Sequence, residues 1–445
     1  MVPEQSQAGG VGCISELDDP YKIYDKKLRS PSEVASMVRD GDTIVAGMIL
    51  SEPYSLLQAL GKVKSEVRGV KLICCLMLGD YGLRSKVDDG SILVESWYYG
   101  AKDRECSRGN VTYIPNNLHS AAKDKIGCEK IKWAWVAASK MDDKGYFRLP
   151  SLVYEKDIIE AADKVVVEVN EKLPVIYGDT EVHVSDVDYV VEGKWDPPTL
   201  EPASPGEVER RIGEYIAELV DDGATIQLGI GKIPNAVALM LRDKKDLGVH
   251  TEMIVDSMME LYEEGVITNK RKTLWEGKIV GVFVYGSRKL YEFVNENDVV
   301  ELHRGRIVND PCTIGLNYKM VSINTALQVD LFGQVCSESI GPVHYTGTGG
   351  QADFHRGAQR SKGGIGIIAL PSTAKGGKIS RIRLFLPEGS KVTVGANDVD
   401  TIVTEYGVAR LKGRSVRDRA KALIEIAHPD FREELYKQAR EAGLL

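Results

Sequence analysis

Short apolar, β-branched runs alternate along the chain with stretches whose apolar residues recur every three or four positions. We predict strands at these runs: residues 43–46, 71–77, 132–137, 165–169, 225–228, 279–284, 365–369 and 392–394. Continuous apolar strands of this length are buried on both faces, as in parallel sheets covered by helices. The pattern therefore predicts the α/β fold class with mainly parallel sheets.

A proline-rich segment separates two sets of predicted elements. Its prolines, within residues 193–206, are Pro197, Pro198, Pro202 and Pro205. Because proline disrupts both helices and central strands, we interpret this segment as a linker. We predict a loose tail over residues 1–21, one lobe over residues 22–192 and a second lobe over residues 207–445. The length of 445 residues fits two domains.

The two lobes begin with a similar order of residues. The first has Ser30-Pro31 and Glu33, then Asp40-Gly41, Thr43-Ile44 and Gly47; the second has Ser204-Pro205 and Glu207, then Asp222-Gly223, Thr225-Ile226 and Gly229. Each order predicts a capped helix, a tight turn, a buried strand and a glycine turn. Chance produces such features singly, but the shared order favours a duplication. Two similar lobes would bind a ligand in the cleft between them.

Composition and charge exclude several classes of function. Lys and Arg total 57 against 65 Asp and Glu, and the net charge of −8 argues against nucleic-acid or anionic-membrane partners. The apolar runs are far shorter than the roughly 20 residues that span a bilayer, and no secretory signal begins the chain. We therefore expect a cytoplasmic protein with reduced cysteines. The cysteines and histidines lack metal-ligand spacing, so no metal site is predicted.

Two glycine-containing segments are candidate ligand sites. The segment Ile226-Gln227-Leu228-Gly229-Ile230-Gly231 ends a predicted strand and precedes a helix, where backbone amides can face an anion. It matches neither the dinucleotide motif nor the P-loop, because a third glycine and a Ser or Thr after Lys232 are missing. The segment with Gly347, Gly349 and Gly350 allows close backbone approach to a ligand. A structural turn is the alternative for the first segment and a plain loop for the second.

The search for a nucleophile leaves a carboxylate. The chain has no Gly-x-Ser-x-Gly elbow, and its cysteines lie in apolar or ordinary surroundings. Glu252 ends an apolar, strand-like segment before a predicted helix at residues 257–264, whereas the duplicated position, near residues 72–75, has no acid. An acid in one copy only is what an asymmetric active site would have, although most glutamates are solvated surface residues.

Several longer motifs resemble those of one family. They are His250-Thr251-Glu252-Met253, Val308-Asn309-Asp310-Pro311, the residues from Ser322 to Val335, Gly347-x-Gly349-Gly350-Gln351-x-Asp353-Phe354 and Ser372-Thr373-Ala374-Lys375. From about residue 22 onwards the chain resembles the acetyl-CoA hydrolase/transferase family, and within it the 4-hydroxybutyrate and butyrate:acetate CoA-transferases. Lys232 departs from the family pattern, which usually has a glycine there.

This resemblance implies two CoA-transferase lobes and a role for each matched residue. Glu252 would attack an acyl-CoA thioester, and the CoA thiolate would then convert the mixed anhydride into a glutamyl-CoA thioester. Asn324 would contact the reacting centre, and amides near Ile230 and Gly350 would hold the oxyanion. The CoA site would be lined by Ile226 to Ile230, Gly347, Gly349, Gly350 and Lys375. CoA is thus expected as a substrate beside a short-chain carboxylic acid, with no tightly bound cofactor, in a homodimer.

Two other functions stay open. A hydrolase would admit water to the same glutamyl thioester, and no motif reports how well water is excluded. A catalytically silent acyl-CoA-binding protein would keep the pocket without turnover. The presence of Glu252 with both glycine segments argues against that second alternative.

Overall fold

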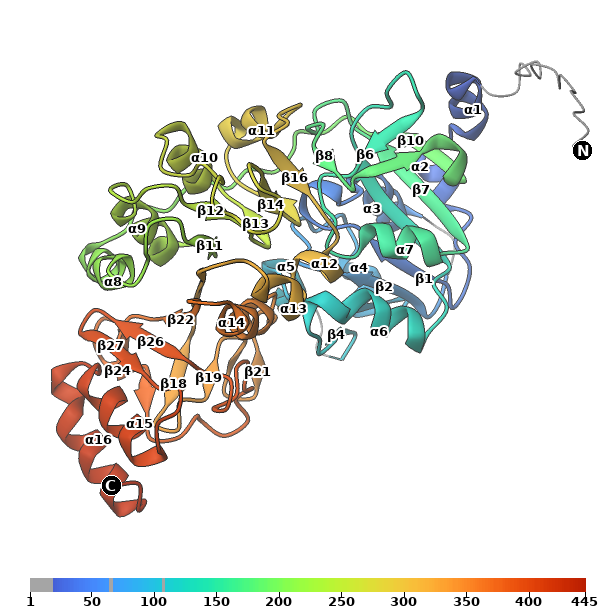
Figure 1. Cartoon of the computed structure of the whole chain (residues 1–445). Helices are drawn as coiled ribbons and strands as arrows, with labels where there is room; N and C mark the ends of the chain where they lie inside the picture. Colours follow the sequence, from blue (N-terminus) through green and yellow to red (C-terminus); the bar gives the residue numbers. More distant parts are fainter. Residues whose placement is uncertain (1–18, 64–66, 106–108) are drawn as a thin grey trace, which may run out of the picture.

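Two α/β lobes make up the described part of the chain, as Figure 1 shows for the computed structural model. The structure describes residues 19–63, 67–105 and 109–445. The predicted tail lies almost wholly outside these residues, as do Cys13 and Cys106. In the described residues, no helix combines the length and the apolar character that a membrane span requires.

The first lobe is built on a seven-stranded parallel sheet in the order β10-β7-β5-β1-β2-β3-β4. These strands are β1 (Thr43–Ala46), β2 (Val70–Cys74), β3 (Ile92–Ser96), β4 (Val111–Tyr113), β5 (Trp133–Ala138), β7 (Lys164–Val169) and β10 (Tyr189–Glu192). The helices are α1 (Pro20–Lys27), α2 (Pro31–Ala35), α3 (Tyr54–Lys62), α4 (Arg84–Asp88), α5 (Ala101–Glu105), α6 (Ala121–Cys128) and α7 (Glu155–Ala161), with a 3-10 turn, η2, at Leu118–Ser120. The strands β6 (Tyr146–Arg148) and β9 (Glu181–His183) form a separate antiparallel pair.

The second lobe has a six-stranded sheet in the order β12-β11-β17-β22-β26-β27, parallel except for its last strand. These strands are β11 (Thr225–Leu228), β12 (Gly248–Val249), β17 (Met320–Thr325), β22 (Ile365–Ala369), β26 (Thr401–Thr404) and β27 (Gly407–Arg410). The helices are α8 (Glu207–Ala217), α9 (Lys232–Met240), α10 (Asp256–Glu263), α11 (Arg288–Val294), α12 (Gly305–Val308), α13 (Pro311–Gly315), α14 (Gln351–Arg360), α15 (Val416–Glu425) and α16 (Pro429–Glu441).

Short strands fill the space around these two sheets. They form the sets β13 (Met253–Ile254) with β15 (Phe283–Val284); β14 (Ile279–Gly281), β16 (Val300–Leu302) and β8 (Tyr177–Gly178); β18 (Gln328–Asp330), β19 (Val335–Cys336) and β25 (Ile382–Arg383); β20 (Ser339–Ile340) with β21 (Val343–His344); and β23 (Thr373–Ala374) with β24 (Ile379–Ser380). Since β8 belongs to the first half of the sequence and pairs with β16, this small sheet joins strands from both lobes.

The strand order supports the predicted duplication. The order β10-β7-β5-β1-β2 in the first lobe matches β26-β22-β17-β11-β12 in the second, and all these pairs are parallel. One helix start differs between the copies. Ser30 and Glu33 form a capping box at α2, whereas Gly206 is the cap of α8 and the Glu209 side chain accepts from its backbone.

The predicted α/β class is confirmed, and most predicted strands lie where the apolar runs are. Two predictions were wrong in detail. Residues 279–284 form two strands, β14 and β15, that belong to different sheets. Val392–Val394 is no strand, because only Val394 bridges to Val335 and Val392 is exposed. The 193–206 segment has neither helix nor strand, and the lobe boundaries drawn from it stay a prediction.

One buried apolar cluster extends through both lobes. Strand residues alternate between it and a cluster on the opposite face of each sheet: Val45 against Ile44 and Ala46 in β1, and Val403 against Ile402 in β26. This alternation follows from the two-residue period of strands. Both faces of each parallel sheet are thus covered. The cluster on the inner faces contains residues of both lobes, so the two lobes share one core.

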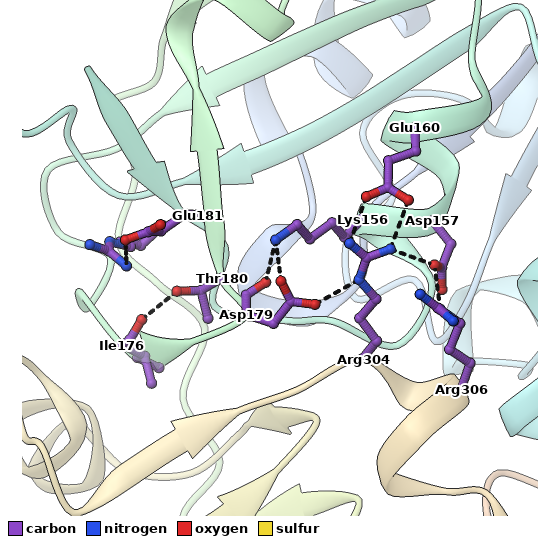
Figure 2. A network of polar contacts seen from close by, with 10 residues as sticks. Lys156, Asp157, Glu160, Ile176, Asp179, Thr180, Glu181, Arg304 and Arg306 are labelled. Carbon is purple, nitrogen blue, oxygen red and sulfur yellow. Dashed lines mark hydrogen bonds and ion pairs between the residues drawn. The ribbon is translucent and has the colours of Figure 1, made fainter. Parts of the chain in front are cut away.

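A buried arginine joins the lobes by ion pairs (Figure 2). Arg304, just before α12, donates to Asp157 Oδ1 at 2.9 Å and Glu160 Oε1 at 2.6 Å on α7, and to Asp179 Oδ2 at 2.7 Å after β8. Two further cations join the network: Lys156 at Asp179 and Arg306 at Asp157. The Arg304 side chain is only 10% exposed. Its loss would leave Glu160 without an ion-pair partner among the described residues, whereas Asp179 would keep Lys156 and Asp157 would keep Arg306.

We expect Arg304→Met to lower the free energy of unfolding by about 2 kcal/mol, because it removes the buried cation shared by Asp157, Glu160 and Asp179 while Lys156 and Arg306 compensate two of these acids. Arg306→Met is the matched control. Arg306 pairs with the same Asp157 but is 52% exposed, and its loss should cost less than about 1 kcal/mol. Urea unfolding of the full chain measures both, and equal losses would contradict a special role for Arg304.

Candidate active site

A cavity of about 470 Å³ opens between the lobes. The first lobe contributes mainly apolar side chains: Met48, Cys75, Leu76, Tyr98, Leu118 and Val153. The second lobe contributes most of the polar groups, among them Gln227, Lys232, Glu252, Asn324, Thr346, Thr348 and Arg381. A cavity of this size and mixed lining can hold a small acyl group together with the reactive end of a longer ligand.

Glu252 lies in the short connection between β12 and β13 and lines this cavity. Its backbone is fixed by the neighbouring strands, since the amides of Val282 and Phe283 both donate to the Glu252 carbonyl, at 2.8 and 3.2 Å. Asn309, directly after α12, donates from Nδ2 to Glu252 Oε2 at 2.7 Å. Within the described part of the chain, no lysine or arginine forms an ion pair with this carboxylate.

Burial raises the pKa of Glu252 to about 7. The hydrogen bond from Asn309 and that from the Gly350 backbone act in the opposite direction, whereas the charge of Asp353 raises the pKa further. A carboxylate with a pKa near neutrality is more basic than a solvated glutamate, and above that pH most copies are ionised. Such a group is suited to nucleophilic attack.

The second glycine segment lies directly against this carboxylate. A Cβ atom on Gly350 would come within 2.0 Å of Glu252 Oε2 and 2.3 Å of Asn309 Nδ2. Gly349 has a positive φ of 52°, and a Cβ there would lie 3.5 Å from Glu252 Oε1. On the other side, a Cβ on Gly347 would meet the Trp97 carbonyl oxygen at 2.6 Å. The segment therefore needs glycine to fit between the two lobes.

Gln227 and Asn324 form a pair of side-chain amides on the cavity wall. Gln227 Nε2 donates to Asn324 Oδ1 at 3.2 Å, and Asn324 Nδ2 donates back to Gln227 Oε1 at 2.9 Å. Ser322 Oγ also donates to Gln227 Oε1, at 2.9 Å. The parallel pairing of β11 with β17 brings these residues together. These reciprocal hydrogen bonds fix the orientation of both side-chain amides toward a ligand in the cavity.

Cys75 takes the place of Glu252 in the first lobe. β1 pairs Thr43 with Lys71, and β11 pairs Thr225 with Gly248, so counting four residues onward reaches Cys75 and Glu252. Both side chains line the cavity. Burial raises the pKa of the Cys75 thiol well above its ordinary value, and the nearby acids Glu155 and Glu252 add to this. The thiol is therefore neutral and a poor nucleophile.

Most of the predicted site residues line the cavity. Those that do are Gln227, Leu228, Gly229, Ile230, Glu252, Asn324, Gly347, Gly349 and Gly350. Ile226 is fully buried inside β11, and Lys375 is exposed in the turn between β23 and β24. Neither Ile226 nor Lys375 is part of the cavity wall, so their roles in binding CoA stay predictions.

Asn309 and Arg381 are polar residues of the site that were not predicted. Asn309 belongs to a quoted motif, but nothing in its spacing indicated that it faces Glu252. Arg381 lines the cavity and donates to the Thr373 carbonyl at 3.2 Å, and burial lowers its pKa. Such a guanidinium can face the phosphates or the carboxylate of a ligand. Among the described residues, no cluster of His, Cys, Asp and Glu could hold a metal ion.

Two domains of one protein family match this chain. Residues 14–198 match the acetyl-CoA hydrolase/transferase N-terminal domain, and residues 286–439 match its C-terminal domain. A 4-hydroxybutyrate coenzyme A transferase of Clostridium kluyveri is 44% identical, over 94% of this chain and 99% of its own length. A succinyl-CoA:cyclohexane-1-carboxylate CoA transferase of Geobacter metallireducens is 43% identical, over 94% of this chain and 96% of its own length.

Solved structures of similar fold cover nearly the whole chain. The crystal structure of RipA from Yersinia pestis superposes with a TM-score of 0.91 at 36% identity, over 96% of this chain and 100% of that one. Relatives named as hydrolases are more distant. An acetyl-CoA hydrolase of Candida albicans is 26% identical, over 70% of this chain and 66% of its own length.

Gly350→Ala should lower turnover by at least about a hundredfold, because the added methyl would displace the Glu252 carboxylate or Asn309. Gly395→Ala is the matched control, since Gly395 has open space around it and an ordinary φ. CoA release from an acyl-CoA, with circular dichroism to verify folding, measures both variants. A fully active Gly350→Ala would show that this close approach has no role in the reaction.

Proposed function

The chain belongs to the acetyl-CoA hydrolase/transferase family, and we propose that it transfers CoA from a short-chain acyl-CoA to a free carboxylic acid. The observation that carries this proposal is the buried, cation-free carboxylate of Glu252 against the glycine segment. The curated relatives at 43–44% identity are named as CoA transferases.

In the first half of the reaction, Glu252 Oε attacks the thioester carbonyl carbon of the acyl-CoA. The C–S bond breaks, CoA leaves as thiolate, and the acyl group stays on Glu252 as a mixed anhydride. The thiolate then attacks the glutamyl carbonyl carbon, and the acyl group leaves as its carboxylate. Glu252 now carries CoA as a thioester, and no redox change or added proton is required.

In the second half, another carboxylate attacks the glutamyl carbonyl and the same steps run in reverse. Each tetrahedral intermediate carries an oxyanion, and the Gly350 and Ile230 amides are the proposed donors to it. The proximity of Gly350 to Glu252 supports its part in this role, and the cavity position of Ile230 supports the second donor. Asn324, oriented by Gln227, is proposed to contact the same reacting centre.

The lining of the cavity favours acids with a mainly apolar chain. Met48, Leu76, Leu118, Val153 and Phe354 surround the space near Glu252 without a charged group on the first-lobe side. Burying a short acyl chain there is favourable because it removes apolar area from water. We propose 4-hydroxybutyrate or butyrate as the acid and acetate as its exchange partner. Coenzyme A is a substrate, and a cytoplasmic homodimer is the proposed state of the protein.

A hydrolase is the second candidate. It would use the same carboxylate but would let water attack the glutamyl thioester. The more distant identity of relatives named as hydrolases favours the transferase. A silent acyl-CoA-binding protein is the third candidate, and the arrangement of Glu252, Asn309 and Gly350 argues against it because binding alone needs no buried carboxylate.

Glu252→Gln should abolish turnover, with a loss of at least about a thousandfold, because the amide keeps the shape but is no nucleophile. Glu263→Gln, on the exposed side of α10, should leave the rate unchanged. In the wild type, acyl-CoA without acceptor should leave CoA on the peptide that contains Glu252, and borohydride should reduce it to an alcohol detectable by mass. Turnover by Glu252→Gln near the wild-type rate would assign the nucleophile elsewhere.

Butyryl-CoA incubated with the enzyme and acetate should yield acetyl-CoA while the total thioester stays constant. Butyryl-CoA with the enzyme alone should lose thioester at most slowly, because completion of the reaction needs a second carboxylate. Chromatography of the acyl-CoAs with a thiol assay follows both quantities. If thioester disappears as quickly without acetate as acetyl-CoA forms with it, the protein is a hydrolase.

A further inference from the structure

The glycine segment is positioned from the opposite lobe. Thr348 is held by hydrogen bonds to two first-lobe residues. Its amide donates to the Tyr113 hydroxyl at 3.3 Å, and its Oγ1 donates to the Asn116 carbonyl at 3.1 Å. Since Gly350 approaches the Glu252 carboxylate so closely, a shift of the segment by a few tenths of an ångström would change the reacting geometry.

One contact in this interface involves two ionisable groups. Asp353, in the first turn of α14 and three residues after Gly350, has a side chain that is 1% exposed. Its Oδ2 accepts from the His119 backbone amide at 3.1 Å, and its Oδ1 lies 2.8 Å from His119 Nδ1. His119 lies in η2 of the first lobe, and its side chain is 28% exposed. Both oxygens of a buried carboxylate are thus satisfied by one residue across the interface.

We propose that His119 and Asp353 are positioning residues, whose two hydrogen bonds hold the first turn of α14 so that Gly350 stays against the Glu252 carboxylate. This inference rests on the proposed function, because it assumes that Glu252 is the group that reacts. Nδ1 must carry the proton, since the carboxylate can only accept. The other ring nitrogen, Nε2, gains or loses a proton, and this change sets the net charge of the His119–Asp353 pair.

The pair also acts on Glu252 through charge. The Asp353 carboxylate raises the pKa of Glu252, and a protonated His119 offsets that charge. The hydrogen bond to Asp353 raises the pKa of His119 against the opposing effect of burial. The other charged groups that act on His119 are acidic: Asp310, between α12 and α13, and Asp124 of α6. Arg356, on the next turn of α14, is paired with Asp398.

Two conservative variants should move the pH dependence of the reaction in opposite directions. The acid limb of kcat/KM reports ionisation of Glu252 in the free enzyme, which we expect near pH 7. His119→Asn keeps a donor but cannot become cationic. The uncompensated charge of Asp353 should therefore raise the pH midpoint of the acid limb by about half a pH unit, which lowers kcat/KM about threefold at pH values below that midpoint. Asp353→Asn removes the negative charge and should lower the midpoint by a similar amount.

The measurement is the rate of butyryl-CoA turnover with acetate from pH 5.5 to 8.5. His119→Ala, which lacks the Nδ1 donor, should also lower the plateau by about tenfold because α14 is held less firmly. His428→Asn is the matched control, because His428 also lies beside an aspartate, Asp430, but at the N-terminus of α16. It should keep the wild-type profile.

A second readout needs no turnover. In protein labelled with carbon-13 at the histidine Cε1 position, the His119 resonance should titrate above an ordinary histidine and shift to lower pH in Asp353→Asn. Midpoints of the rate that move in the same direction, or do not move, in an active enzyme would overturn the proposal. A wild type with no turnover but with an Asp353-sensitive His119 titration would instead overturn the proposed function and leave the pair in place.

Discussion

A carboxylate buried without a cation is the constraint on which the site depends. A lysine or arginine beside Glu252 would stabilise its charge and make it a weaker nucleophile. The chain instead solvates it with neutral donors, the Asn309 amide and the Gly350 backbone. Such donors are effective only at short range, so α12 and the first turn of α14 must both reach the same carboxylate. The glycines of the 347–350 segment follow from this requirement.

The duplicated lobes show how an asymmetric site can arise from a symmetric frame. The two sheets share five strands in the same order, and equivalent positions carry Cys75 in one lobe and Glu252 in the other. Both side chains enter the same cavity, but burial leaves the thiol neutral and the carboxylate ionisable near neutral pH. The first lobe therefore supplies walls and anchoring contacts, and the second supplies the carboxylate that we propose as the reactive group.

Local patterns predicted the main strands and made Glu252 a candidate, because apolar runs and a single acid at a strand end are visible in the sequence, but its role came from the resemblance to a known family. They merged β14 and β15 into one strand, and they did not predict β13 and β16, which have two or three residues each and no periodicity to detect. Asn309 and His119 act through contacts with residues far away in the sequence, and spacing cannot show such contacts. Ile226 was included with its neighbours, but the two-residue period of β11 turns it into the core while Gln227 faces the cavity.

The single core shared by the lobes limits how ligands can come and go. Opening the cleft by a hinge would expose the apolar cluster, separate β8 from β16 and break the Arg304 network. Each of these changes is costly, so the lobes are expected to stay together through a catalytic cycle. Departing and arriving acids must then exchange through the opening of the same cavity, one after the other, while CoA remains bound to the protein. Because the walls stay in place, the fit of an acid's chain between them selects among acids before any bond is formed.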